Sequence, residues 1–234
     1  MCGRYTNLFK WKQLHRLMTL TTPPMEFGER YNIAPTQAAP VVRAADRGEK
    51  RVDPLRWGLI PSWADDASIG SGLINARSET VTQKPAFRGA YQGRRCVVPA
   101  SGFYEWKAVT AEKRKQPYYL LPSADDDLFL FAGLWERWVP KDGGQAVETF
   151  AILTTNANEL MAAMHDRMPV ILQPEDARLW LDVGAGADAL RSLLKPFPSE
   201  LMRQYPVSTL VNSPKNDTAA CIEPCQEHGT GLLF

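Results

Sequence analysis

The sequence predicts an α+β fold: a single domain with a mainly antiparallel, barrel-like β-sheet core and peripheral helices. Its 234 residues are enough for one large domain. Strand and turn patterns dominate residues 30–109, and helical patterns return in the second half. Because strands and helices do not alternate strictly, a doubly wound parallel sheet is disfavoured. We expect one domain over 1–234, in which residues from about 218 to 234 form a C-terminal tail.

The first expected helix lies near the N-terminus. Asn7 can cap it, because an asparagine side chain accepts a hydrogen bond from a free N–H of the first turn. Leu14, Leu17 and Met18 follow at helical spacing, and Thr22-Pro23-Pro24 ends the helix.

Strands and further helices follow in order along the chain. We expect strands at 41–42, 55–57, 95–98, from 103 onward, 118–121, 128–134, 149–153 and 207–211. Asn158 can cap a helix over 159–165, and Pro174 suits the first turn of a helix over 175–181. A third helix is expected over 187–194.

Composition narrows the class of protein. The formal net charge is +1, so no global field demands nucleic acid, although a local basic patch is compatible with it. The four cysteines are spaced too irregularly for a disulfide scaffold, which favours reduced thiols in a cytoplasmic protein. No targeting signal and no apolar run of about 18 residues is found, so we expect no membrane partner.

The sequence predicts neither a metal nor a cofactor. Cys221 and Cys225, with His228 nearby, are spaced more widely than the tight pair common in zinc sites, and a fourth ligand is missing. The sequence has no phosphate loop, no Rossmann glycine pattern and no HExxH motif.

Cys2 is the residue with the most distinctive chemistry. If Met1 is removed, Cys2 carries a free α-amine beside its thiol. Such an amine, with a pKa of about 7.7–8.0, is substantially neutral near pH 7 and can attack an aldehyde. The thiol can then close a five-membered thiazolidine ring on the same carbon. The alternative is that Cys2 merely lies in a frayed terminus.

Two further residues could transfer protons. Glu105 lies among aromatic residues, which can raise the pKa of a carboxylate, but it could equally pair with Lys107 on a solvated face. His165 ends a predicted helix, where the dipole favours a protonated imidazole. An equally acceptable interpretation makes His165 a helix cap or the partner of Asp166.

Four other residues are candidates for positioning or DNA contact. Asn75 could orient a sugar oxygen or hold the amine, and Arg77 would point the same way on an extended segment and could bind phosphate. Trp63 lies between prolines and aspartates, which marks it as an exposed stacking surface, and Pro35 could act as an apolar wedge. Taken alone, Asn75 and Arg77 read as ordinary surface residues.

Several segments together resemble one family, the SOS-response-associated peptidase (SRAP) family. They occur in the family's order: Met1-Cys2-Gly3-Arg4-Tyr5, Tyr31-Asn32-Ile33-Ala34-Pro35, Trp57-Gly58-Leu59-Ile60-Pro61-Ser62-Trp63, Ile74-Asn75-Ala76-Arg77-Ser78-Glu79-Thr80, Gly102-Phe103-Tyr104-Glu105-Trp106, His165-Asp166-Arg167-Met168-Pro169 and Val211-Asn212-Ser213-Pro214-Lys215-Asn216-Asp217. The resemblance covers about residues 2–217.

The resemblance implies a function and a set of residues. Members of the family bind single-stranded DNA and crosslink to abasic sites. The resemblance places the nucleophile at Cys2, the other catalytic residues at Asn75, Glu105 and His165, and DNA contacts at Arg4, Pro35, Trp63 and Arg77. The expected partner is single-stranded DNA with an abasic site, bound by a monomer, with a replication fork as one setting and association with the nucleoid if the source is bacterial.

Two other functions compete with this interpretation. An N-terminal cysteine can also serve an amidohydrolase of the glutamine amidotransferase type, in which the thiol attacks an amide and the α-amine acts as base. The chain could instead be a noncatalytic single-stranded DNA binder in which Cys2 is incidental. A self-processing peptidase activity that removes the N-terminal residue is compatible with the family's name.

Overall fold

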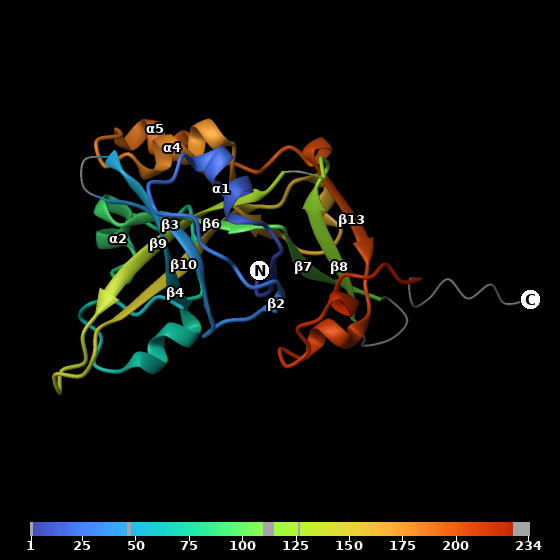
Figure 1. Ribbon diagram of the computed structural model, residues 1–234, viewed down its shortest axis with the longest axis horizontal. Helices are drawn as coiled ribbons and strands as arrows, with labels where there is room; N and C mark the ends of the chain where they lie inside the picture. The colour runs from blue at the N-terminus through green and yellow to red at the C-terminus, as the bar shows by residue number, and fades with distance from the viewer. Residues whose placement is uncertain (1, 46–47, 110–114, 126, 227–234) are drawn as a thin grey trace, which may run out of the picture.

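The chain folds around two β-sheets (Figure 1). The computed structural model describes residues 2–45, 48–109, 115–125 and 127–226. The smaller sheet is antiparallel and has the order β13-β8-β7-β1-β2. Its strands are β13 (Met202–Pro206), β8 (Lys115–Pro122), β7 (Gly102–Ala108), β1 (Tyr5–Asn7) and β2 (Arg30–Ile33).

The larger, eight-stranded sheet contains a closed barrel. Its strands are β3 (Ala38–Ala44), β4 (Lys50–Trp57), β5 (Asn75–Arg77), β6 (Arg95–Ala100), β9 (Phe129–Trp138), β10 (Val147–Asn156), β11 (Arg167–Pro169) and β12 (Ile171–Leu172). The order β10-β4-β3-β6-β9 closes because β9 also pairs with β10. Only the pairs that β10 makes with β4 and β5 are parallel among the described strands. The predicted α+β fold with a mainly antiparallel, barrel-like core is therefore confirmed.

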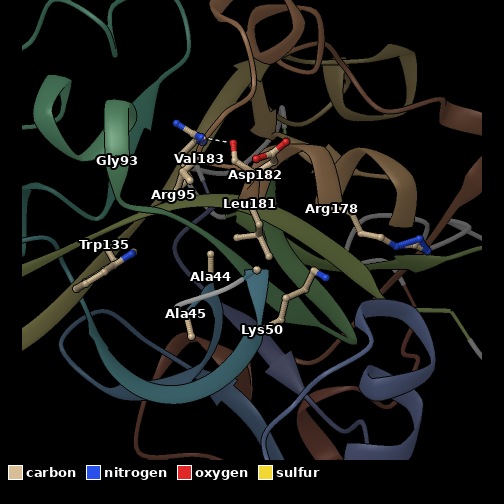
Figure 2. Close-up of a pocket in the computed structure, with 11 residues that line it drawn as sticks. Ala44, Ala45, Lys50, Gly93, Arg95, Trp135, Arg178, Leu181, Asp182 and Val183 are labelled. Atoms are coloured by element: carbon tan, nitrogen blue, oxygen red, sulfur yellow. Dashed lines mark hydrogen bonds between the residues drawn. The ribbon is translucent and has the colours of Figure 1, made fainter.

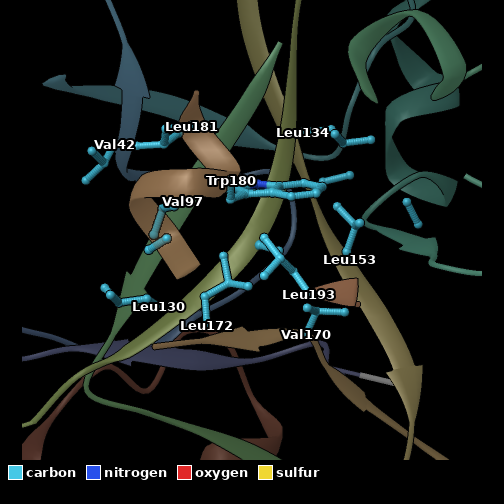
Figure 3. Close-up of a cluster of buried hydrophobic side chains, with 14 of the residues drawn as sticks. Val42, Val97, Leu130, Leu134, Leu153, Val170, Leu172, Trp180, Leu181 and Leu193 are labelled. Atoms are coloured by element: carbon cyan, nitrogen blue, oxygen red, sulfur yellow. The ribbon is translucent and has the colours of Figure 1, made fainter. Parts of the chain in front are cut away.

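Four of the five described α-helices pack against one buried cluster of the barrel, whereas the short helix over residues 159–162 packs against the cluster that the barrel shares with the smaller sheet. The helices are α1 (Trp11–Met18), α2 (Arg88–Gly93), α3 (Glu159–Ala162), α4 (Pro174–Leu181) and α5 (Ala187–Ser192). Trp180 of α4 is fully buried among barrel side chains such as Val97, Leu134 and Leu153 (Figure 3). A second buried cluster joins the barrel to the smaller sheet and contains Cys2. None of the described helices is both long and apolar enough to cross a membrane.

The N-terminal segment differs from the expectation. Asn7 does not cap a helix, because it pairs with Arg30 as the last residue of β1 and is 3% exposed. Helix α1 begins four residues later, and Lys10 occupies its N-cap without a side-chain hydrogen bond. Backbone pairing between β1 and its neighbours outweighs the local capping preference of asparagine.

The C-terminal part also needs two corrections. The expected strand at 207–211 is wrong: the final strand is β13, which ends at Pro206, and a 3-10 turn covers Thr209–Asn212. Ser208 caps that turn by accepting from the Leu210 N–H at 3.3 Å. The helix expected over 159–165 ends at Ala162, although Asn158 does cap it by accepting from the Met161 N–H at 2.9 Å.

The chain stays packed beyond residue 218 within the described part. A 3-10 turn covers Ala219–Cys221, and Cys221 is fully buried. Pro224 forms an isolated antiparallel bridge with Val207. Residues 227–234 lie outside the described residues, and with them His228.

Replacing Gly58 with alanine should destabilise the fold. Gly58 has φ of +118°, and an added Cβ would lie 2.6 Å from the carbonyl oxygen of Gly70. Strain at positive φ and overpacking each cost about 1–3 kcal/mol, so we expect a loss of about 2–4 kcal/mol in the free energy of unfolding. Urea denaturation measures it. Gly72→Ala is the control, because an added Cβ there meets nothing within 4 Å; equal midpoints for both variants would contradict the close approach.

Candidate nucleic-acid interface and reactive centre

Strand β1 fixes Cys2 beside β7. Tyr5 pairs with Phe103, and the Arg4 carbonyl accepts from the Tyr104 N–H at 3.0 Å. Continuing this antiparallel register places Gly3 opposite Glu105, one residue from Cys2. The residues that precede β1 are therefore held against β7, and because Cys2 is fully buried, the frayed-terminus interpretation of Cys2 is wrong.

Cys2 is fully buried in an apolar cluster. Burial raises the pKa of its thiol far above the usual range, and the nearby negative charge of Glu105 raises it further. A hydrogen bond from the backbone of Arg4 acts in the opposite direction. The thiol is therefore protonated near neutral pH, and its sulfur becomes a nucleophile only if its proton is taken up as the bond forms.

Asn75 contacts the same residue from the larger sheet. Its Nδ2 donates to the Cys2 carbonyl oxygen at 2.9 Å. Asn75 begins β5, which pairs in parallel with β10 through Ile152. Its Oδ1 is buried and has no hydrogen-bond partner among the described residues. A buried acceptor without a donor is costly, so this oxygen is suited to accept from a bound molecule.

Glu105 lies in the interior of the protein. Its exposure is 3%, so it does not lie on a solvated face. Its effect on the pKa of Cys2 places its carboxylate near the thiol. Lys107 lies further along β7, with its Nζ 5.5 Å from the centre of the Tyr118 ring. A carboxylate next to a thiol and a chain terminus can accept and return protons.

His165 lies just beyond α3, at the C-terminal turn of that segment. Its backbone N–H donates to the Met161 carbonyl at 2.9 Å. Its Nδ1 is 3.0 Å from the Arg167 backbone nitrogen and 2.7 Å from Asp166 Oδ1. The first contact needs a lone pair on Nδ1 and the second needs a proton there, so His165 can make only one of them at a time. Met161 belongs to the buried cluster that contains Cys2.

Arg167, which the sequence did not single out, ties this region together. Its Nη1 and Nη2 donate to the two carboxylate oxygens of Glu79 at 2.6 and 2.9 Å, and Nη2 also donates to the Thr154 carbonyl at 2.7 Å. The hydrogen bonds from Arg167 lower the pKa of Glu79, which stays ionised near neutral pH. The motif His165-Asp166-Arg167-Met168-Pro169 contained the signal, but its partner lies 88 residues away in the chain.

Arg4 makes contacts within the protein. Its Nη1 donates to Asn32 Oδ1 at 2.9 Å and to the Val211 carbonyl at 2.7 Å, and its Nη2 donates to the Asn212 carbonyl at 3.1 Å. Asn32, in turn, donates to carbonyls of the 211–216 segment. The predicted phosphate contact of Arg4 stays a prediction, and its present contacts join β1 to the C-terminal segment.

The other predicted DNA contacts lie at the surface. Trp63 is 57% exposed, in agreement with its predicted exposure. Arg77 is exposed at the end of β5, two residues after Asn75. Pro35 is half-buried and lies two residues after Ile33, the last residue of β2. Ile33 pairs with Tyr5, the first residue of β1. The register of β1 on β7 thus places Cys2 near Glu105, and the Asn75 amide reaches Cys2 from the larger sheet. His165 is linked to them through Met161, which packs in the same buried cluster as Cys2.

A separate pocket of about 550 Å³ lies at the end of β4 that begins with Lys50 (Figure 2). Lys50, Trp135 and Arg178 line it, and Arg95 donates to the Asp182 carbonyl there at 2.6 Å. None of the predicted site residues lines this pocket.

The family can now be assigned. Residues 1–214 match the family model described as SOS response associated peptidase (SRAP). This chain belongs to the SRAP family. The abasic site processing protein YoqW of Bacillus subtilis is 42% identical over 226 residues, which cover 95% of this chain and 99% of that protein. The abasic site processing protein HMCES of Xenopus tropicalis is 36% identical over 222 residues, covering 82% of this chain and 65% of that protein.

The SRAP fold is also seen in a solved structure. A crystal structure of a protein from Bacteroides thetaiotaomicron superposes with a TM-score of 0.84 at 29% identity. The alignment covers 96% of this chain and 100% of that one. The similarity of fold therefore extends over 96% of this chain.

Alkylation should distinguish the buried Cys2 thiol from the partly exposed Cys225. Burial raises the pKa of the Cys2 thiol and blocks access to it. We therefore expect iodoacetamide at pH 8 to modify Cys2 about tenfold more slowly than Cys225. Peptide mass spectrometry of timed samples measures both rates. In guanidinium chloride the two rates should converge, and equal rates in the native protein would contradict the burial of Cys2.

Arg4→Ala should lower stability, whereas Arg77→Ala should not. Arg4 loses three hydrogen bonds to the protein, two of them to carbonyls of the C-terminal segment. Hydrogen bonds from charged groups contribute about 1.5–3 kcal/mol, and part exposure of Arg4 reduces this, so we expect a loss of about 1–3 kcal/mol. Urea denaturation measures it. A wild-type midpoint for Arg4→Ala would show that these contacts are dispensable.

Proposed function

We propose that this protein senses abasic sites in single-stranded DNA and, once Met1 is removed, forms a covalent thiazolidine crosslink with them through Cys2. The observation that carries the proposal is the convergence of Cys2, Asn75 and Glu105, which come from three different strand regions of two sheets. Relatives that are 36–42% identical and are named abasic site processing proteins support it.

The reaction begins with the amine of Cys2. An abasic deoxyribose is mostly a closed hemiacetal, and proton transfer by Glu105 opens it to the C1′ aldehyde. The neutral amine attacks C1′, and loss of one water gives a Schiff base. The sulfur then adds to the imine carbon while the thiol proton ends on the nitrogen. The resulting ring has no exposed imine, so it resists hydrolysis and strand-cleaving β-elimination.

The surroundings of Cys2 suit these proton transfers. A protonated, buried thiol does not compete with the amine for the aldehyde, and it is positioned for the second addition. Glu105 is the nearby base that relays its proton, and His165 serves proton transfer at the sugar oxygen. Asn75 holds the Cys2 carbonyl through Nδ2, and its Oδ1 accepts from the amine or from a sugar hydroxyl.

DNA is held mainly through its backbone and an unstacked base. Arg77 contacts a flanking phosphate, Trp63 stacks on a base, and Pro35 separates neighbouring bases. Arg4 contributes to phosphate binding through the guanidinium N–H groups that do not donate to Asn32, Val211 or Asn212. We expect a monomer acting on single strands, including those at replication forks, and in a bacterium an association with the nucleoid. The family's description as a peptidase supports self-processing at Met1.

The decisive experiment uses single-stranded DNA with one abasic site and a denaturing gel. The mature protein should give a heat-stable covalent band and no glutaminase activity, which an amidohydrolase would show. Cys2→Ser should lose this band and leave only an imine that borohydride traps, because its amine remains but its thiol does not. Cys225→Ser, which alters a cysteine outside the site, should crosslink like the wild type.

Two outcomes would contradict the proposal. A stable adduct from Cys2→Ser without reduction would exclude a thiazolidine. Full crosslinking by a protein whose Met1 is shown by mass spectrometry to be retained would exclude the α-amine as nucleophile. A noncatalytic DNA binder would shift the DNA in a native gel and give no covalent band at all.

A further inference from the structure

A second polar pocket begins where β5 ends. It has a volume of about 550 Å³, and its lining includes Ser78, Glu79, Thr82, Tyr91, Arg191 and Lys195. It also includes Thr155 and Asn156, at the end of β10. Ser78 follows directly after Arg77, and its backbone N–H donates to the Thr154 carbonyl at 2.9 Å. The pocket therefore extends along the strand that carries two of the predicted site residues.

The pocket carries net positive charge. Arg191 and Lys195 are exposed, and their side chains have no ion pair or hydrogen-bond partner among the described residues. Glu79 is the carboxylate that lines the pocket, and Arg167 neutralises it through two hydrogen bonds of 2.6 and 2.9 Å. Two cations without carboxylate partners in one concave site favour an anionic ligand.

Hydroxyl groups complement the two cations. Burial raises the pKa of Tyr91, whereas the charges of Arg95 and Arg191 lower it, which places Arg191 near the phenol. The Tyr91 hydroxyl has no hydrogen-bond partner among the described residues. Thr82 adds a further hydroxyl to the lining, whereas the Ser78 hydroxyl already hydrogen-bonds to Glu79. Hydroxyl, guanidinium and ammonium groups are the donors that commonly contact phosphate oxygens.

The walls of the pocket are held in place. Thr155 Oγ1 donates to the Leu194 carbonyl at 3.1 Å, which ties the segment after α5 to the end of β10. Asn158 Nδ2 donates to the Phe197 carbonyl at 2.7 Å, just beyond. Lys195 therefore lies between two anchored residues, and Arg191 lies just before them in the last turn of α5, so little backbone ordering is needed when a ligand binds.

The pocket lies within reach of a DNA strand whose abasic sugar reacts at Cys2. Asn75, whose Nδ2 contacts the Cys2 carbonyl, is three residues before Ser78. At about 3.3 Å per residue, the two positions are about 10 Å apart along β5. The exposed Arg77 lies between them. Cations therefore follow one another outward from the reactive centre.

We propose that this pocket binds a backbone phosphodiester of the DNA strand whose abasic sugar reacts at Cys2, through Arg191 and Lys195. The inference rests on the proposed function and extends it to a second contact region beyond Arg77. It predicts that the DNA strand leaves the reactive centre along β5 and runs across the pocket, over the hydrogen bond that joins the end of β10 to the segment after α5.

The test is the salt dependence of binding to single-stranded DNA, measured by fluorescence anisotropy with an intact, base-containing strand that cannot crosslink. The double variant Arg191→Ala/Lys195→Ala should raise Kd roughly tenfold at physiological salt. The slope of log K against log salt should fall by about 1.4, since each phosphate contact on a single strand contributes about 0.7. Both residues are exposed, and unchanged urea midpoints confirm that the variant folds.

The matched control is Lys50→Ala/Arg178→Ala, which removes two cations from the pocket in Figure 2, at the far end of β4 from Trp57. This variant should keep the wild-type slope. Equal losses in both double variants would mean a diffuse charge effect and would overturn the proposal. So would an unchanged slope in Arg191→Ala/Lys195→Ala.

A third measurement separates a strand from a free anion. If inorganic phosphate at millimolar concentration perturbs Tyr91 in NMR spectra while the double variant binds DNA normally, the pocket is a small-anion site and the proposal fails. At subsaturating abasic DNA, the double variant should crosslink more slowly than the wild type, because it binds the strand more weakly. If the wild-type protein itself forms no crosslink, the proposed function fails. Failure of the pocket proposal and failure of the proposed function are therefore distinguishable.

Discussion

The pairing of β1 with both of its neighbours is the interaction on which the site depends. This strand has only three residues, yet β2 holds one edge and β7 the other. Arg4 adds contacts to Asn32 and to the 211–212 carbonyls, and Asp217 accepts from the Asn32 N–H at 2.9 Å. A chain terminus normally frays. Here the N-terminal segment is restrained by β2, by β7 and by contacts with the 211–212 carbonyls, which gives the amine and thiol of Cys2 a fixed position.

Strand β10 positions the site residues that come from the larger sheet. It pairs with β9 and β4 to close the barrel, and with β5 and β11 at its C-terminal half. These last two pairings bring Asn75 and the segment after His165 to the same end of one strand. Arg167 locks the arrangement by contacting both Glu79 and the Thr154 carbonyl. The reactive centre thus lies where β5, which pairs with β10, meets the residues that precede β1.

The polar groups at this centre carry a cost that the rest of the fold offsets. A thiol, a carboxylate and an amide oxygen are enclosed in a largely apolar cluster, and the Asn75 oxygen has no donor among the described residues. Such a buried acceptor costs about 1–3 kcal/mol. Extensive aromatic packing around it, including the Tyr5–Trp57 and Phe103–Phe131 pairs, contributes stabilisation in the same cluster. Local disagreement between burial and polarity is typical of functional sites.

The sequence by itself determined the fold class and the family, because motif order and hydrophobic periodicity are local properties of the chain. The reactive residues that it indicates, Cys2, Asn75, Glu105 and His165, stay a prediction. The assignment of Asn7 as a helix cap was wrong because long-range strand pairing overrides that local preference. The strand expected over 207–211 was wrong because a 3-10 turn capped by Ser208 follows β13 there. The sequence also left Glu105 equally divided between a solvated pair and a buried base. Only the tertiary structure decided that Glu105 is buried beside Cys2, that Asn75 holds its carbonyl, and that Arg4 contacts the C-terminal segment. These contacts join residues 73 to 207 positions apart, and burial and pKa depend on such neighbours rather than on sequence spacing.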